Sequence, residues 1–104
     1  MNHIDLIGNL ATDVNFRVKE GKNGQSVSYC YFNLGYTRRD KSCFIQIWCF
    51  NKLAESVTQY CRKGGRVAVS GELEVTDERQ QDGTYLVKPR IIADSVDFID
   101  GERK

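Results

Sequence analysis

The sequence predicts an all-β domain with a single helix, and three observations support that expectation. Apolar and polar side chains alternate along several short segments, as they do in strands whose two faces have different surroundings. Helical periodicity occurs in only one stretch, residues 52–62. The 104 residues suit one domain, and a single proline with nine scattered glycines argues against a disordered or fibrous chain.

The first half of the chain contains two predicted strands. His3–Leu10 has a strand-like pattern, in which Gly8 indicates a bend or a bulge. Gly21–Gly24 predicts a turn before the second strand, Ser26–Tyr36. That strand has an apolar face of Cys30, Phe32 and Leu34 and a mixed face of Tyr29, Tyr31 and Asn33. Arg38–Ser42 is expected to form a basic, polar loop.

The third predicted strand, Cys43–Phe50, is rich in aromatic residues. Alternation places Phe44, Gln46, Trp48 and Phe50 on one face and Cys43, Ile45, Ile47 and Cys49 on the other. The second face suits a hydrophobic core. The first face has two interpretations: a second layer covers it, so that Trp48 and Phe50 are ordinary core residues, or it is a surface on which planar groups stack.

The helix is expected over Lys52–Arg62, where apolar side chains recur at helical spacing, namely Leu53, Val57, Tyr60 and Cys61. Asn51 can cap its first turn, and Gly64-Gly65 ends it. Arg62 and Lys63 suit the negative end of the helix dipole.

Two more strands follow the helix. Arg66–Leu73 is expected to be the fourth, with Val67, Val69 and Leu73 in register, and Ile91–Ile99 the last, with Asp82-Gly83 at a hairpin tip between them. Three strands, a helix and two strands is the order of the OB-fold, a five-stranded Greek-key barrel whose second and third strands form the binding face. The sequence therefore predicts an OB-fold domain over residues 1–99 and a short C-terminal extension over residues 100–104.

Composition and motifs exclude several classes of function. No apolar run approaches the roughly 20 residues of a membrane span, and no signal peptide precedes the first strand, so a cytoplasmic protein is expected. The four cysteines form no C-x-x-C pair and the only histidine is His3, so free thiols, no metal and no cofactor are expected. A P-loop, a dinucleotide fingerprint and a nucleophile elbow are all missing, and the chain is not expected to be an enzyme.

The charges are polarised along the chain although the net charge is only +1. Residues 1–71 contain ten Lys and Arg against five Asp and Glu, whereas residues 72–104 contain five against nine. A domain of this kind can present one basic face to a polyanion, although charge runs also occur as plain solvated surface.

Several blocks of the sequence resemble the bacterial-type single-stranded DNA-binding proteins. The blocks are N-H-I-D-L-I-G-N-L, D-V-N-F-R, C-Y-F-N-L-G-Y-T-R, F-I-Q-I-W-C-F-N-K-L-A-E, Y-C-R-K-G-G-R-V-A-V-S-G-E-L and I-I-A-D-S-V-D-F-I. The resemblance runs from residue 2 to about residue 99. It implies that Phe44 and Phe50 stack on bases and that Arg17 contacts the nucleic acid. The pattern differs at Val14, where the family usually has proline, and in the acidic residues Glu72, Glu74, Asp77 and Glu78.

The predicted interface combines stacking aromatics with cations that meet phosphates. Trp48 joins Phe44 and Phe50 by strand parity, and Tyr31 borders the groove. The cations expected to meet phosphates are Arg17, Arg38, Arg39, Lys41 and Lys52. Neither kind of contact identifies base edges, so binding is expected to be largely independent of base sequence. Stacking grooves often tolerate both backbones, so the sequence does not distinguish DNA from RNA as the ligand.

The expected function is protection of single-stranded DNA during replication, recombination or repair by a nucleoid-associated homo-oligomer, with a tetramer preferred over a dimer. The alternative is an OB-fold protein-interaction module of a replication or primosome assembly with weak DNA binding, whose acidic second half contacts a partner. Many family members recruit partners through an acidic tail with an apolar tip. Asp100–Lys104 contains no apolar residue, so recruitment by that route is not expected.

Overall fold

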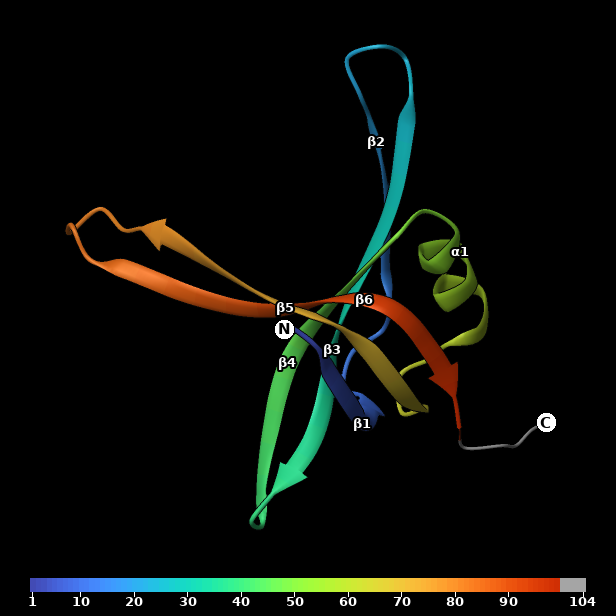
Figure 1. Ribbon diagram of the computed structural model, residues 1–104, viewed down its shortest axis with the longest axis vertical. Helices are drawn as coiled ribbons and strands as arrows, with labels where there is room; N and C mark the ends of the chain where they lie inside the picture. Colours follow the sequence, from blue (N-terminus) through green and yellow to red (C-terminus); the bar gives the residue numbers. More distant parts are fainter. Residues whose placement is uncertain (100–104) are drawn as a thin grey trace.

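The computed structural model describes residues 1–99, so the predicted extension over residues 100–104 lies outside the described part. Six strands and one helix follow one another along the chain: β1 (Ile4–Leu10), β2 (Asn15–Glu20), β3 (Ser26–Arg38), β4 (Lys41–Phe50), α1 (Asn51–Tyr60), β5 (Arg66–Arg79) and β6 (Tyr85–Phe98). Figure 1 shows the barrel with α1 on one side and three hairpins that project in different directions.

The strands close into a barrel in the order that an OB-fold requires. The sheet runs β1-β5-β6-β4-β3-β2, and an additional pairing between β1 and β3 closes the ring. The only parallel contact is between β4 and β6 among these described strands, and the other neighbours are antiparallel. The predicted OB-fold is confirmed. The sixth strand is β2, which sequence analysis did not predict and which pairs with the first half of β3.

The core lies inside the barrel and agrees with the predicted strand faces. Cys30, Phe32 and Leu34 of β3 are fully buried, as are Ile47 and Cys49 of β4. Further buried side chains come from β1, α1, β5 and β6, namely Leu10, Ala54, Val57, Cys61, Val67, Val69, Ile91 and Ala93. All four cysteines are free, and three of them are buried as small apolar side chains.

Gly8 allows two strands to approach closely where the barrel closes. A Cβ atom on Gly8 would lie 2.3 Å from the carbonyl oxygen of Gly35 on β3, a distance that real structures do not tolerate. Gly8 is therefore needed for a close approach of two backbones, and not for the bend or bulge that was predicted there. The register shift lies instead on β5, between Ser70 and Gly71.

The helix differs from expectation at its ends. α1 runs over Asn51–Tyr60, its N-cap is Phe50, and no side chain caps it. Asn51 does not cap because it is the first helical residue, with a φ of 58° in the left-handed region that asparagine tolerates. At the other end Arg62 donates hydrogen bonds to the carbonyl oxygens of Thr58, Gln59 and Cys61. This agrees with the prediction that Arg62 lies at the negative, C-terminal end of the helix. Tyr60 was expected on the apolar face but is exposed.

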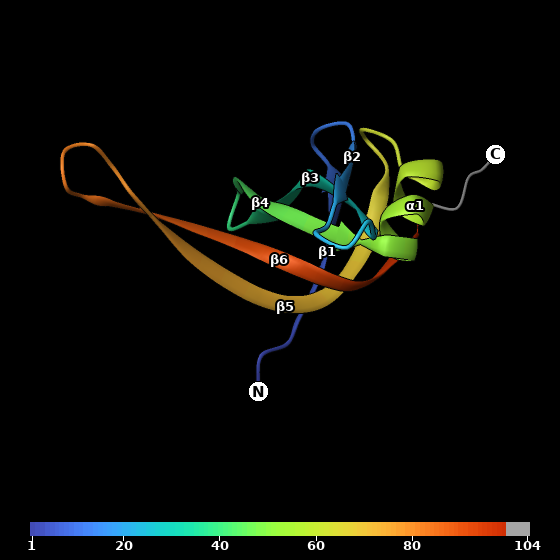
Figure 2. The same cartoon turned by 90° about the horizontal axis from the view of Figure 1, so that it is seen from above.

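Several strands are longer than predicted, and they form the projecting hairpins. The expected loop Arg38–Ser42 is a two-residue turn, because Arg39 and Asp40 have φ values of 51° and 65° while Arg38 and Lys41 pair within the sheet. β5 and β6 continue beyond the barrel and end in the predicted turn at Asp82-Gly83. Figure 2 shows this β5–β6 arm, defined here as residues 74–90, extending away from the barrel. Leu73 at its base is exposed rather than part of the core.

Candidate nucleic-acid interface

The outer face of the barrel is built from register pairs that run across five strands, β2, β3, β4, β6 and β5. One row joins Arg17, Tyr29 and Phe50, and the next joins Asn15, Tyr31, Trp48 and Ile92. A third row joins Asn33, Gln46, Arg90 and Glu74, and beyond it Gly35 faces Phe44. Because opposite residues in a sheet point to the same side, one continuous surface carries all of these side chains.

Trp48 is the centre of an aromatic cluster on this face. Its ring stacks on Tyr31 with centroids 5.0 Å apart and on Tyr29 with centroids 5.5 Å apart. The centroid of the Phe50 ring lies 6.3 Å from the ring centroids of both Trp48 and Tyr29. The indole nitrogen donates a 2.7 Å hydrogen bond to the side-chain oxygen of Gln46, which fixes the orientation of the ring. Within residues 1–99 no second layer buries these rings, because Trp48 is half-buried and Phe50 is exposed. The interpretation of Trp48 and Phe50 as ordinary core residues is therefore wrong.

An open hollow lies beside the cluster. Its volume is about 430 Å³. Lys19 and Val27 of the β2–β3 hairpin, Tyr29, Trp48 and Phe50 of the cluster, and Arg90 of β6 line it. Aromatic walls with a cation at each side provide a stacking surface together with positive charge, which is the combination that unpaired nucleotides need.

Phe44 lies apart from the cluster, near the N-terminal end of β4. Its ring lies against Gly35, because a Cβ atom there would be 3.2 Å from Phe44 Cε1. The side chain is 63 % exposed, which is unusual for phenylalanine. A second hollow of about 500 Å³ is lined by Phe44 and by residues 6–10 of β1, and Tyr36, Ser42 and Arg66 also line it. Phe44 is thus available for stacking at a point separate from Trp48.

The predicted cations fall into two groups. Arg17 lies in the same row as Tyr29 and Phe50, so the structure brings it to the aromatic face. Arg38 and Lys41 are register partners at the tip of the β3–β4 hairpin. By strand alternation they share a face with Tyr36 and Cys43, which is the opposite face from Phe44. Arg39 occupies the turn itself, and Lys52 is exposed in the first turn of α1.

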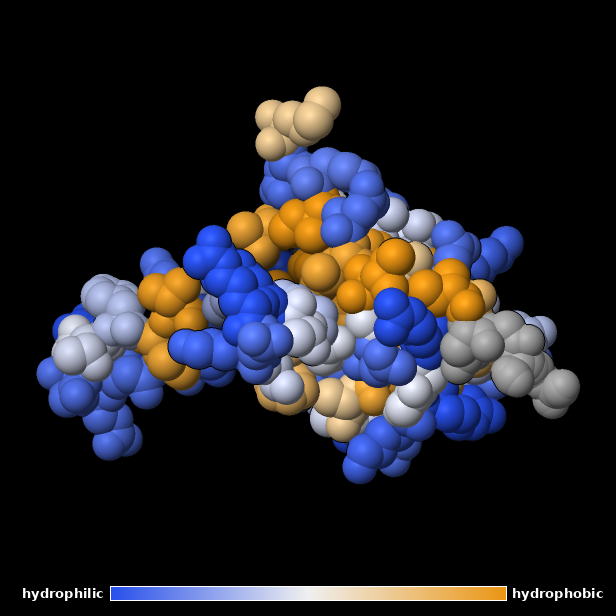
Figure 3. Space-filling model, turned by 90° about the horizontal axis from the view of Figure 1, so that it is seen from below, coloured by the Kyte–Doolittle hydropathy of each residue, from blue (hydrophilic) through white to orange (hydrophobic). Residues whose placement is uncertain are grey.

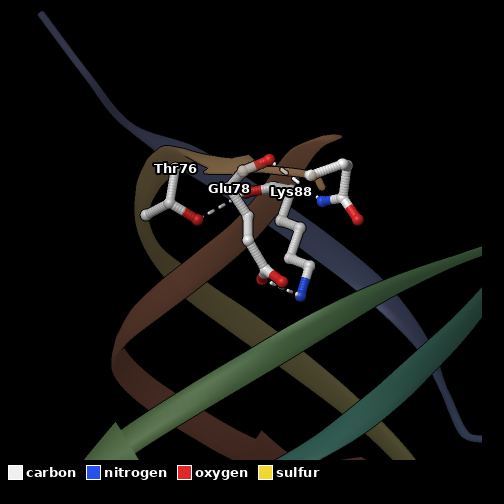
Figure 4. A network of polar contacts seen from close by, with 4 residues as sticks. Thr76, Glu78 and Lys88 are labelled. Atoms are coloured by element: carbon white, nitrogen blue, oxygen red, sulfur yellow. Dashed lines mark hydrogen bonds and ion pairs between the residues drawn. The ribbon is translucent and has the colours of Figure 1, made fainter. Parts of the chain in front are cut away.

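The acidic residues of the arm are partly neutralised by its basic residues. The carboxylate of Glu74 accepts a 2.7 Å hydrogen bond from Arg90 Nε and forms an ion pair with Arg90 Nη2. Glu78 forms a 2.7 Å ion pair with Lys88, and Figure 4 shows this pair beside Thr76, whose hydroxyl donates to the Lys88 carbonyl oxygen. Two of the four acidic residues in which the chain departs from the family pattern, Glu74 and Glu78, therefore have cationic partners.

Four residues of this surface were not among the predicted site residues, namely Lys19, Val27, Tyr29 and Arg90. Tyr29 shares the parity of Tyr31, so the alternation of β3 contained a signal for it. Lys19 and Val27 follow from the pairing of β2 with β3, and β2 itself was not predicted. Arg90 reaches Trp48 only because β6 lies parallel to β4, and local sequence patterns do not predict that pairing.

The buried thiols form a cluster beneath the aromatic face. Cys30 and Cys49 are register partners on β3 and β4, and a hydrogen bond between them together with burial raises the pKa of the Cys49 thiol well above its usual range. Burial also raises the pKa of the Cys61 thiol. Raised pKa values disfavour the nucleophilic thiolate at Cys49 and Cys61, so these two cysteines act as packing residues. Within residues 1–99 no group of three potential ligands is arranged to hold a metal ion.

Comparison with known proteins identifies the family. The model of the single-strand binding protein family matches residues 1–99. The chain belongs to this family. Members are binding proteins rather than enzymes, in agreement with the expectation from the motifs. Across the described residues, no helix has the length and apolarity needed to cross a membrane.

Curated relatives carry the same description. The single-stranded DNA-binding protein of Clostridium perfringens is 36 % identical over 103 residues, which cover 96 % of this chain and 67 % of that protein. Those of Helicobacter hepaticus and Wolinella succinogenes are 28 % and 26 % identical, each over 97 % of this chain and over 62 % and 65 % of their own lengths. The chain therefore spans about two thirds of the length of these relatives.

Proposed function

We propose that this chain binds and protects single-stranded DNA during replication, recombination or repair, largely independently of base sequence. The observation that carries the proposal is the outer face of β3 and β4, where Tyr29, Tyr31, Trp48 and Phe50 occupy adjacent register rows. Membership of the single-strand binding protein family and the names of its relatives support the same function. Residues 1–99 form the binding domain in this proposal.

Binding combines two contributions that differ in their response to salt. Stacking of a base on an aromatic side chain contributes about 1–3 kcal/mol and does not depend on which base stacks. Cations that meet phosphates release counterions, so their contribution falls as salt rises. We assign stacking to Phe44, Trp48 and Phe50, with Tyr31 at the border, and phosphate contacts to Arg17, Arg38, Arg39, Lys41 and Lys52. Arg17 has the strongest support, because it shares a row with Phe50.

A second candidate function follows from the β5–β6 arm. Val75 and Val87 are more than half exposed there, beside the acidic Asp77 and Glu78. An OB-fold protein-interaction module that used this arm to contact a replication partner would bind DNA weakly.

Two further features of the proposal concern assembly and location. Figure 3 shows apolar side chains gathered on one face of the barrel and a smaller group on the arm, as expected of surfaces that other protein covers. We propose a homotetramer, with a dimer as the alternative. Bound to single strands, it would be part of the nucleoid in the cytoplasm.

Titration with oligo-dT while the Trp48 fluorescence is recorded tests the function. Trp48 is the only tryptophan of the chain, so stacking of a base near it is expected to quench a single, assigned signal. The protein-interaction alternative predicts little quenching and weak binding. Oligo-U in a parallel titration reports whether the surface prefers DNA to RNA. A normally folded protein that binds neither oligo-dT nor oligo-U would contradict the proposal.

A further inference from the structure

Glu74 is an acidic residue on a surface that is proposed to bind a negatively charged strand. It lies in the same row of the outer face as Gln46 and Arg90, next to the row of Trp48. A carboxylate at this position repels phosphate, and simple electrostatics therefore predicts that it weakens binding. The geometry around Glu74 indicates a different role.

Glu74 holds the guanidinium group of Arg90 in a fixed position. One carboxylate oxygen accepts from Nε at 2.7 Å and also contacts Nη2, so two N–H groups on one edge of the guanidinium plane share an anchor. The Arg90 side chain is 27 % exposed, more buried than its partner at 43 %. Such a planar, charge-assisted contact orients an arginine more strictly than it would a lysine.

The anchored guanidinium lies over the indole ring. Arg90 Cζ is 4.5 Å from the Trp48 centroid, within the range of a cation–π contact. Arg90 also lines the 430 Å³ hollow that the aromatic cluster borders. The guanidinium is therefore one wall of this hollow, and the donors that Glu74 does not use remain for a phosphate.

We propose that Arg90 is part of the single-strand binding surface and that Glu74 is its positioning residue, so that this acid strengthens binding. The inference rests on the proposed function. A free arginine side chain samples many rotamers, and ordering it costs binding free energy, whereas an arginine that is already ordered meets the nucleic acid without that cost. A base or a phosphate that enters the hollow then meets a planar cation already in place.

Replacement of Glu74 distinguishes positioning from repulsion. Glu74→Ala is expected to weaken oligo-dT binding about twofold to fivefold, the range of a lost exposed cation–π contact. The matched control is Glu72→Ala, which removes an acid two residues away with the same strand parity and no ion pair within the described residues. Repulsion alone predicts that both variants bind more tightly. If Glu74→Ala binds as tightly as the wild type or more so, the inference is wrong.

Arg90→Lys tests whether shape matters beyond charge. Lysine keeps the charge, so the salt dependence of binding is expected to stay the same while the affinity falls by a similar factor. Wild-type affinity for Arg90→Lys would overturn the inference even if Glu74→Ala did not fold. Failure of the wild-type protein itself to bind oligo-dT would instead overturn the proposed function.

Fluorescence of the free protein provides a readout independent of binding. Loss of the guanidinium from the Trp48 ring in Arg90→Gln is expected to change the emission of the single tryptophan. Glu74→Ala is expected to produce the same change because Arg90 is released, whereas Glu72→Ala is not. Unchanged emission in Glu74→Ala would mean that Arg90 stays in place without Glu74 and would contradict the positioning role.

Discussion

At the scale of single residues, exposure separates the aromatics that hold the barrel together from those that it presents. Phe32 is 1 % exposed and Phe44 is 63 % exposed, although both lie in the central strands. Strand parity predicted this division correctly for β3 and β4. It could not predict that Trp48 is already in contact with two tyrosines and an arginine, because those contacts depend on neighbouring strands.

Replacement of the exposed phenylalanines tests their role in stacking. Phe44→Ala and Phe50→Ala are each expected to weaken oligo-dT binding by about 1–3 kcal/mol, since each removes one stacking surface. Thermal unfolding should remain close to that of the wild type. Phe32→Ala is the control for a core residue and is expected to destabilise the domain by about 3–5 kcal/mol. Normal binding by either of the first two folded variants would remove that residue from the interface.

The close approach at Gly8 is a second property of a single residue. Gly8→Ala places a methyl group 2.3 Å from the Gly35 carbonyl oxygen, and since both are backbone positions the strands must separate. We expect a loss of about 1–3 kcal/mol in the free energy of unfolding by urea. Gly24→Ala is the comparison, because its φ of 75° is unfavourable for alanine but no atom lies within 4 Å. A smaller loss for Gly8→Ala than for Gly24→Ala would contradict this account of barrel closure.

At the scale of elements, local patterns predicted the strands that contribute to the core and missed those that do not. Cys30 and Ile47 lie on strands with a continuous apolar face, which makes such strands recognisable. β2 and the outer halves of β5 and β6 have little or no buried side, so no alternation of burial marks them. The pairing of Gln46 with Arg90 joins residues that only the closed barrel brings together.

The arm can therefore be shortened without loss of the barrel. Replacement of Glu78–Leu86 by Asn-Gly keeps the pair Asp77 and Val87 and closes the hairpin with a favourable turn. Because no residue from 74 to 90 is buried, we expect the midpoint of thermal unfolding to change by only a few degrees. A large destabilisation, measured by circular dichroism, would show that the arm supports the fold. The same variant, tested against oligo-dT, reports whether the tip of the arm lies beside the DNA.

At the scale of the whole molecule, one edge of the barrel lacks a partner. β5 covers one edge of β1, but β3 pairs only with Asn9 and Leu10 on the other edge, so residues 4–8 have no strand there within the described chain. Ile7 in this segment is 51 % exposed. Unpaired strand edges and exposed apolar side chains are the features that a second copy covers. Asp5 lies within the same segment and His3 immediately precedes it.

The proposed tetramer makes a prediction about mass and about β1. Light scattering at tens of micromolar is expected to give about four times the 11.9 kDa of one chain. Ile7→Asp should lower this mass, because a carboxylate on the unpaired edge of β1 opposes close contact with a second copy. Val18→Asp is the matched control, since Val18 is also an exposed β-branched residue but lies on β2. A monomer mass for the wild type would contradict the proposed assembly, and an equal decrease in both variants would place the contact elsewhere than on β1.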